Sequence, residues 1–209
     1  MPPDLDGVEA AAREVLDAKY AARETGLANS RQAIRRCANA IRSLHRGEEA
    51  EALALMDEAA GLLSEAYSRL AEHPDVLYAG FVSDASKEYA EARLFHALSS
   101  SAPLPLPDDL GVPVVPYLHG LGEAVGEMRR RMLDLLRAGD LEGGEAALRA
   151  MDTILELLAS LDYPDGMTSG LRRTTDVARA LVERSRSDLT TTVIQERLRR
   201  SLEAADSSQ

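Results

Sequence analysis

Residues 117–135 read YLHGLGEAVGEMRRRMLDL, and their apolar side chains recur every three or four positions. This spacing is typical of an amphipathic α-helix, which buries one face against a hydrophobic core. The same segment carries Glu123 and Glu127 one turn apart, so both carboxylates lie on one side of the helix. The segment therefore predicts a helical fold and a place where acidic groups gather.

Helical periodicity continues over most of the chain, and strand patterns are almost absent. Pro74 and Pro116 suit first-turn positions, while Gly47 and Gly139 suit helix ends. We expect long helices at about residues 5–46, 48–72, 74–99, 116–138, 140–162 and 168–204. The predicted fold class is all-α, an elongated helical bundle of about six or seven helices.

The chain of 209 residues is 45% hydrophobic, enough for one substantial core, so we expect residues 1–209 to form a single domain. Residues 99–116 hold three consecutive serines and five prolines and are predicted to be an extended connection between two helices. Such a segment is either a flexible tether or a crossover that lets the flanking helices pack side by side. Residues 204–209 are expected to fray.

No apolar run approaches the roughly 20 residues that a membrane helix needs, and the N-terminus lacks the pattern of a signal peptide. We therefore expect a cytoplasmic protein without a membrane partner. The single cysteine, Cys37, excludes an intramolecular disulfide and a cysteine-based zinc site. Its position among apolar residues favours a buried, inert thiol.

The formal net charge is -11, but the positive charge is concentrated in two segments. Residues 23–46 contain six arginines and one acid, and residues 171–200 contain eight arginines and four acids. Only Lys19 and Lys87 are lysines, so nearly every cation is a guanidinium, the group that suits phosphate. An acidic protein with two basic regions can still bind nucleic acid through those regions.

Four arginines of the first predicted helix, Arg31, Arg35, Arg42 and Arg46, fall within an arc of about 60° when successive residues turn by about 100°. These guanidinium groups either pair with acids on neighbouring helices or bind phosphate. Because only 4% of the residues are aromatic, base stacking is disfavoured. We expect recognition of the phosphate backbone instead.

Two pairs of glutamates, Glu88 with Glu91 and Glu123 with Glu127, lie three or four residues apart on predicted helices. Cβ atoms at this spacing are roughly 5 to 6 Å apart, so two facing helices could hold one or two divalent cations. Such a site suits metal-assisted hydrolysis of a phosphodiester. The alternative is an ordinary solvated helix face, which shows carboxylates at the same spacing.

Gly120, Gly122 and Gly126 lie among these acidic residues, although each glycine inside a helix costs about 0.5 to 1 kcal/mol relative to alanine. Close packing of a neighbouring helix would explain them, and so would room for a bulky phosphodiester. His119 lies one turn before Glu123, where a histidine is more commonly structural or exposed than a metal ligand.

Several segments, spread over roughly residues 13–200, resemble the translin family. They are SRQAIRR at 30–36, LHRG at 44–47, KEYAEA at 87–92, YLHGLGEAVGEMR at 117–129, LDYP at 161–164 and GLRRTTDV at 170–177. Within that family the chain looks most similar to translin-associated factor X (TRAX) and its archaeal relatives. The resemblance implies an active site of two glutamates on one helix and an Asp or Glu plus a Glu on the next.

Glu88, Glu91, Glu123 and Glu127 match those four places, with Glu123 where the animal proteins have aspartate. The resemblance thus implies a Mg²⁺- or Mn²⁺-dependent endoribonuclease, with these glutamates as catalytic and metal-binding residues. It also implies a hollow homo-oligomer, such as an octamer, that cleaves RNA, preferably single-stranded, and binds single-stranded DNA. The candidate RNA-binding residues are Arg31, Arg35, Arg42, Arg46, Arg172 and Arg173.

Three other functions fit the same residues. A translin-like assembly would bind RNA or DNA without catalysis, and turnover that depends on metal and on the glutamates would exclude it. A ferritin-like di-metal oxidase is disfavoured, because neither Glu88 nor Glu123 is followed by histidine three positions later. A purely structural bundle would tolerate substitution of the glutamates.

Overall fold

The computed structural model describes residues 5–206, which contain helices and no strand. The long helices are α1 (Asp6–Arg46), α2 (Glu49–Leu70), α4 (Phe81–Ser100), α6 (Val114–Arg137), α7 (Leu141–Ser160) and α9 (Leu171–Asp206). Helices of four residues each are α3 (Pro74–Leu77), α5 (Pro107–Leu110) and α8 (Asp165–Thr168). The all-α prediction is confirmed. The described residues form nine helices instead of six or seven, because three short helices lie in the connections.

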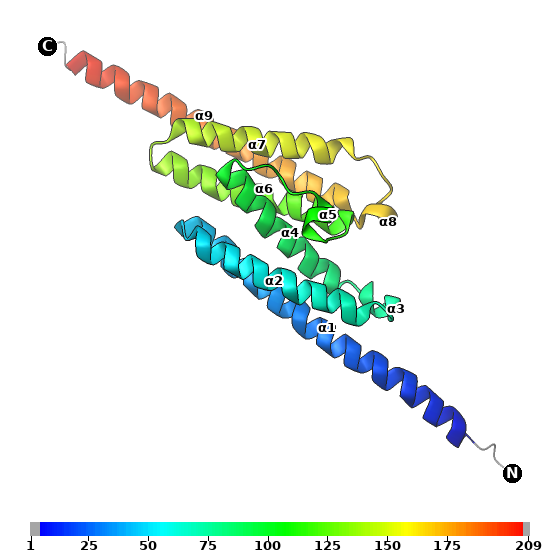
Figure 1. The fold of residues 1–209 in the computed structure, drawn as a ribbon. Coiled ribbons are helices and arrows are strands. Elements are labelled where there is room, and N and C mark those ends of the chain that lie inside the picture. Colours follow the sequence, from blue (N-terminus) through cyan, green and yellow to red (C-terminus); the bar gives the residue numbers. More distant parts are fainter. Residues whose placement is uncertain (1–4, 207–209) are drawn as a thin grey trace.

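Helix α4 lies at the centre of the bundle and joins its two parts (Figure 1). On one side it packs against the hairpin of α1 and α2, and on the other side it packs against α6. Helix α6 in turn contacts α7 and α9, which also contact each other. The first part of α1 and the last part of α9 extend past the body at opposite ends, so the bundle is elongated, as predicted (Figure 1).

One hydrophobic core runs through all the long helices. Fully buried side chains from all six long helices meet in it, among them Met56, Phe95, Leu121, Met151 and Val182. The three- and four-residue spacing of the apolar positions puts them on one face of each helix. Burial of these faces is the main favourable contribution that holds α4 between the two parts of the bundle.

Cys37 of α1 belongs to this core and is completely buried, as the sequence predicted. Burial raises the pKa of its thiol to about 12, and the negative charges of Glu88 and Glu91 act in the same direction. The thiol therefore stays neutral, and we assign it no chemistry.

The prediction of a single helix at residues 74–99 is wrong. Helix α3 ends at Leu77 and α4 begins at Phe81, with a turn between them. Gly80 in this turn has a φ of 103°, which glycine adopts without the steric cost that a side chain would add. The turn separates α4 from the preceding segment.

Residues 99–116 connect α4 to α6 and include the short helix α5. Leu110 and Val112 are buried in this connection. The hydroxyl of Tyr117 donates a hydrogen bond to the carbonyl oxygen of Pro105 at 2.8 Å. The connection is thus packed onto the bundle, and the helices that it joins lie against each other.

Helix α9 continues to Asp206. Residues 207–209, which belong to the segment 204–209 predicted to fray, lie outside the described residues, as do residues 1–4. Over the described part of the chain, no helix combines the length and the apolar character that a membrane span requires.

Candidate metal centre

Helices α4 and α6 pack backbone against backbone at Gly120. A Cβ atom on this residue would lie 2.6 Å from the carbonyl oxygen of Lys87 and 2.8 Å from the backbone nitrogen of Glu91. No side chain fits in contacts this short, so glycine lets the two backbones touch. Close helix packing, one of the two explanations for the glycines, therefore holds at this position. The contact brings the glutamates of the two helices together.

Three carboxylates meet beside this crossing. Oxygens of Glu88, Glu91 and Glu123 all lie within 4.8 Å of one another. Glu91 is only 9% exposed, whereas the side chains of Glu88 and Glu123 are 27% and 39% exposed. The cluster is therefore closed at Glu91 and open to a ligand at Glu123.

The surroundings of Glu91 disfavour a charged carboxylate. Burial, followed by the negative charges of Glu88, Glu123 and Glu127, raises the pKa of Glu91 to about 8, and the positive charge of Lys87 opposes this rise. Burial also raises the pKa of Glu88. Carboxyl groups with raised pKa values that share one site are stabilised in their ionised form by a cation, and they mark candidate functional sites.

The ammonium group of Lys87 lies between the two helices. Its Nζ donates a hydrogen bond to Oε1 of Glu123 at 2.8 Å and lies 3.5 Å from Oε1 of Glu88. Within residues 5–206, no other lysine or arginine forms an ion pair with the three clustered carboxylates. Lys87 is thus the cation that pairs with the cluster in this structure.

Glu127, the fourth predicted ligand, is not a member of this group of three. Its Oε2 lies 2.5 Å from Nε2 of His45, which belongs to the last turn of α1. The side chain of His45 is 6% exposed, and its ring centroid lies 4.9 Å from that of Phe95. Because His45 is packed in this way, it fixes the position of the Glu127 carboxylate one turn from Glu123.

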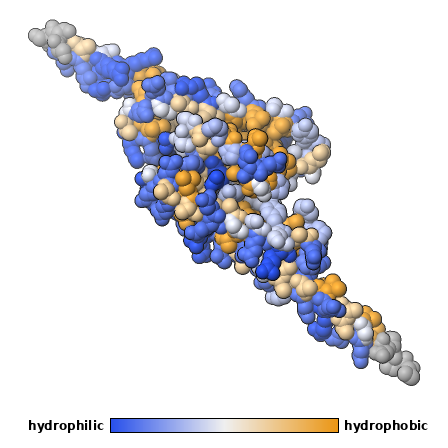
Figure 2. All heavy atoms as spheres, in the orientation of Figure 1, coloured by the Kyte–Doolittle hydropathy of each residue, from blue (hydrophilic) through white to orange (hydrophobic). Residues whose placement is uncertain are grey.

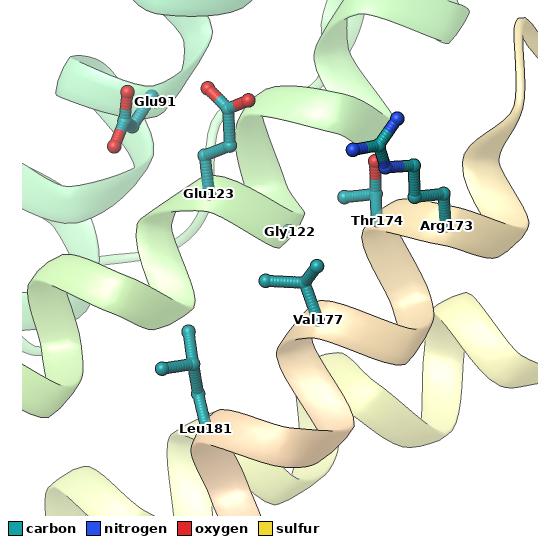
Figure 3. Close-up of a pocket in the computed structure, with 7 residues that line it drawn as sticks. All are labelled: Glu91, Gly122, Glu123, Arg173, Thr174, Val177 and Leu181. Atoms are coloured by element: carbon teal, nitrogen blue, oxygen red, sulfur yellow. The ribbon is translucent and has the colours of Figure 1, made fainter.

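A cavity of about 410 Å³ opens beside the carboxylates. Its size is within the range of about 300 to 1,000 Å³ that is usual for ligand pockets. Figure 3 shows Glu91 and Glu123 on one side of it and Arg173 on the other, on α9. Arg173 is exposed and forms no ion pair within the described residues. The remaining lining residues are Gly122, Thr174, Val177 and Leu181.

Two of the predicted RNA-binding arginines have partners inside the protein. Arg46 forms an ion pair with Glu48 at 2.5 Å, and Arg42 donates a hydrogen bond to the side chain of Asn39. Both arginines are exposed. Ion pairs at such exposed positions are weak, so these contacts do not exclude a second partner.

The other predicted arginines are exposed and have no acidic partner within residues 5–206. Arg31 and Arg35 lie in the middle of α1, whereas Arg172 and Arg173 lie at the start of α9. Arg173 lines the cavity beside the glutamates, while Arg172 lines a separate cavity of about 890 Å³. The structure thus brings only Arg173 of this set to the carboxylate cavity.

His119 is a structural residue. Its Nε2 donates a hydrogen bond to the carbonyl oxygen of Thr168 at 2.9 Å, and its Nδ1 accepts one from the hydroxyl of Thr174 at 2.8 Å. Both ring nitrogens therefore have a partner, one at the end of α8 and the other in α9. A Cβ atom at Gly122 would lie 2.3 Å from Cγ2 of Thr174, so this glycine also serves close packing of α6 on α9.

The chain is similar in sequence and in fold to solved structures of C3PO. It is 32% identical to AfC3PO, over 89% of this chain and 97% of that chain, with a TM-score of 0.82. This chain belongs to the translin/TRAX-like C3PO family. A structure of AfC3PO in complex with duplex RNA matches at 33% identity over 89% of this chain and 96% of that chain, with a TM-score of 0.80. Apo-NeC3PO has the same fold, at 20% identity over 92% of this chain and 98% of that chain, with a TM-score of 0.75.

This C3PO-family chain is also 27% identical over 191 residues to the uncharacterized protein MJ0175 of Methanocaldococcus jannaschii, which corresponds to 88% of this chain and 82% of the relative. No family model matches the chain. Its assignment to the C3PO family therefore rests on the similarity to the solved structures.

The sequence predictions assigned no role to two residues of this C3PO-family site. Lys87 directly precedes Glu88 and is one of only two lysines, and that rarity is a signal that could have identified it. His45 lies 82 positions from Glu127, and no pattern in the sequence links the two residues.

Proposed function

We propose that this chain is a metal-dependent endoribonuclease of the TRAX type. Glu88, Glu91 and Glu123 would bind Mg²⁺ or Mn²⁺, with Glu127 as the fourth carboxylate of the site. The observation that carries the proposal is the convergence of three carboxylates from two helices, whose oxygens lie within 4.8 Å of one another. Two of the three, Glu91 and Glu123, line a cavity.

The donor set suits a divalent cation. Carboxylate oxygens are the ligands that Mg²⁺ and Mn²⁺ prefer in proteins. Glu91 has a pKa of about 8 because it is buried among other acids, so a nearby positive charge would stabilise its ionised form. Lys87 pairs with Glu88 and Glu123, and Glu91 has no ion pair within residues 5–206. This buried carboxyl group supports a role for a metal ion in the cluster.

A bound Mg²⁺ or Mn²⁺ supplies Lewis-acid activation of water and neutralises charge at the phosphate. The side chains of the protein hold the RNA. Arg173 faces the carboxylates across the cavity and would bind a phosphate oxygen next to the scissile bond. Arg31 and Arg35 would bind phosphates elsewhere along the strand. Val177 and Leu181 give the cavity an apolar wall, which would contact a sugar or base and exclude water.

RNA is the proposed ligand because AfC3PO has been solved in complex with duplex RNA. The unpaired arginines and the aromatic content of 4% support recognition of the phosphate backbone, which single and double strands share. We also propose a preference for single-stranded RNA and binding of single-stranded DNA. Both rest on the resemblance to TRAX.

We further propose that the chain forms a homo-oligomer, such as an octamer, with the glutamates facing its interior. The first part of α1 and the last part of α9 protrude from the body, and apolar surface follows the protruding part of α1 (Figure 2). Apolar rows of this kind favour burial against other copies of the chain. The side chains, each 58% to 65% exposed, are Leu5, Val8, Val15, Leu16, Tyr20, Ile194, Leu198 and Leu202.

Cleavage of an end-labelled single-stranded RNA tests the proposal, with Mg²⁺, with Mn²⁺ and with EDTA. We expect cutting that requires metal and is lost in Glu123→Ala and in Glu127→Ala. RNA affinity should stay equal or increase in both variants, because carboxylates repel phosphate. Glu145→Ala, which removes an exposed carboxylate on α7, is the matched control and should cut normally. Cleavage of the RNA by the wild-type protein in EDTA would reject the assigned site, and so would cleavage by Glu123→Ala at the rate of the wild type. Duplex RNA and single-stranded DNA in the same assay test the strand preference.

A non-catalytic RNA-binding assembly is the second candidate, and one observation favours it. The contacts of Lys87 with Glu88 and Glu123 and of His45 with Glu127 give three of the four glutamates a partner without any metal. In that case the protein would retain RNA and leave it intact under every metal condition.

A further inference from the structure

Lys87 stands where the two glutamate-bearing helices meet. Its carbonyl oxygen faces Gly120 in a tight backbone contact, so the packing of α4 on α6 determines its place. Its ammonium group lies 2.8 Å from Glu123 of α6 and 3.5 Å from Glu88 of α4, and 25% of its side chain is exposed. The ammonium group thus bridges both helices at the position where a metal ion would contact the same two carboxylates.

The charges around Lys87 do not balance. Three carboxylates lie within 4.8 Å of one another, and one ammonium group pairs with two of them. Glu91 is buried and forms no ion pair within residues 5–206. One positive charge leaves the cluster attractive to a divalent cation. The ammonium group and that cation would repel each other between Glu88 and Glu123.

The chemical identity of the residue suits a partner that can be displaced. Only Lys19 and Lys87 are lysines among 24 basic residues. An arginine would grip a carboxylate at two points with a planar fork, whereas an ammonium group is a compact charge on a flexible four-carbon chain. Lysine can therefore release the carboxylates and turn into solvent at a lower cost than arginine.

We propose that Lys87 is an internal counter-ion that competes with the divalent metal for Glu88 and Glu123. This inference rests on the proposed function, because it assigns Lys87 a role at the same metal site. In the metal-free protein the ammonium group holds carboxylates of α4 and α6 together. When a metal binds, the ammonium group leaves them. Lys87 thereby stabilises the metal-free bundle and limits the metal affinity of the site.

The test compares Lys87→Met with the wild-type protein by calorimetric titration of Mn²⁺ and by thermal unfolding in EDTA. Methionine is unbranched like lysine and only one heavy atom shorter, and it removes the charge. We expect Mn²⁺ to bind at least about tenfold more tightly, because a competing positive charge is gone. The Tm in EDTA should fall, because the carboxylates lose their counter-ion. If Lys87 had only a structural role, the Tm of Lys87→Met would fall while its Mn²⁺ affinity stayed unchanged or became weaker. That outcome would overturn the proposal.

Lys19→Met is the matched control, because it makes the same chemical change at the other lysine. Lys19 pairs with Asp75 at 2.7 Å and joins α1 to α3. We expect its Mn²⁺ affinity to equal that of the wild type. If Lys19→Met also bound Mn²⁺ tenfold more tightly, the effect would come from the net charge of the protein, and the role of Lys87 would be rejected.

Lys87→Arg keeps the positive charge and covers the case in which Lys87→Met does not fold. Its Mn²⁺ affinity should equal or fall below that of the wild type, because a guanidinium group holds Glu123 more firmly. Tighter binding would overturn the proposal. If the wild type binds Mn²⁺ and cuts RNA, and Lys87→Met binds Mn²⁺ no more tightly than the wild type does, only the proposed role of Lys87 is rejected. If neither protein binds Mn²⁺, the metal site of the proposed function fails as well.

Discussion

The imidazole Nε2 of His45 lies 2.5 Å from Oε2 of Glu127, although 82 positions separate the two residues in the sequence. The contact joins the last turn of α1 to α6. The ring is held in place by Phe95 of α4, whose centroid lies 4.9 Å away. Three helices thus determine where the Glu127 carboxylate lies. Residues that orient a ligand carboxylate in this way are a regular part of metal sites.

Replacing His45 with alanine should therefore impair the metal site without removing any carboxylate. We expect His45→Ala to lower RNA cleavage or Mn²⁺ affinity by about 10- to 100-fold, the usual effect of losing a residue that orients a ligand. His45→Gln keeps a hydrogen-bond donor and should recover part of this loss. Cleavage rates and calorimetric titration of Mn²⁺ measure both effects.

The control for this prediction is His96→Ala. Nε2 of His96 lies 2.7 Å from the exposed carboxylate of Glu49, so the variant removes a similar contact between α4 and α2. Its Mn²⁺ affinity should match that of the wild type. Normal cleavage and normal Mn²⁺ binding in His45→Ala would exclude a positioning role for His45.

The long helices could be predicted from the sequence because their apolar faces arise from local periodicity. The first helix, for example, ends at Arg46, directly before Gly47 with a φ of 78°, as the glycine indicated. The break at Gly80 could not be predicted in the same way. A glycine inside a helical pattern is often tolerated, and only the packing of the neighbouring segments decides whether it ends the helix.

The glutamate pairs were predictable for the same local reason, since residues three or four apart share a helix face. The relation between the pairs depends on how deeply α6 packs against α4, and this depth is set at Gly120. The periodicity of the sequence does not determine how closely one helix packs against another, or how each helix is rotated about its own axis. For that reason the sequence indicated two pairs of carboxylates, whereas the structure groups three and places Glu127 against His45.

The backbone contact at Gly120 predicts a large effect of a small substitution. In Gly120→Ala the new methyl group would lie 2.6 Å from the carbonyl oxygen of Lys87, so α4 and α6 must move apart. We expect the free energy of unfolding to fall by about 1 to 3 kcal/mol, as overpacking in a core usually causes. Unfolding in urea measures the change, and Mn²⁺ affinity should fall with it because the carboxylates separate.

Gly126→Ala is the matched control on the same helix. A Cβ atom there would meet only Cδ1 of Leu181, at 3.9 Å, which is ordinary contact. Alanine favours the helix over glycine by about 0.5 to 1 kcal/mol, so this variant should be slightly more stable than the wild type. Equal losses of stability in the two variants would show that the crossing at Gly120 has no special role.

The unpaired arginines of α1 should contribute to RNA affinity through charge. We expect Arg31→Ala and Arg35→Ala to weaken binding of single-stranded RNA, with the slope of log K against log salt reduced by about 0.7 for each phosphate that the variant no longer binds. Arg36→Ala is the control, because Arg36 already forms an ion pair with Glu58 at 2.8 Å. Fluorescence anisotropy over a salt series measures the slopes. Slopes that stay unchanged in Arg31→Ala and Arg35→Ala would remove this surface from the RNA-binding region.

The raised pKa of Glu91 predicts that this residue destabilises the metal-free protein near neutral pH. The pKa rises from an ordinary value of 4.5 to about 8 on folding, so the folded state binds the proton more tightly than the unfolded state. The contribution of the protonated carboxyl group to the free energy of unfolding is complete below pH 4.5 and is lost as the pH rises to about 8. Glu91→Gln keeps a neutral side chain at every pH. In EDTA it should therefore be more stable than the wild type by on the order of 3 kcal/mol at pH 7, and by much less at pH 4.

Urea unfolding at both pH values in EDTA checks this prediction, with Glu156→Gln as the control because Glu156 is exposed on α7. The difference in free energy of unfolding between Glu156→Gln and the wild type should be the same at both pH values. Mn²⁺ should stabilise the wild type more than Glu91→Gln, because only the wild type keeps every carboxylate of the cluster. If Glu91→Gln gave the same stability as the wild type at pH 7 and gained as much from Mn²⁺, Glu91 would be neither a strained buried acid nor a ligand.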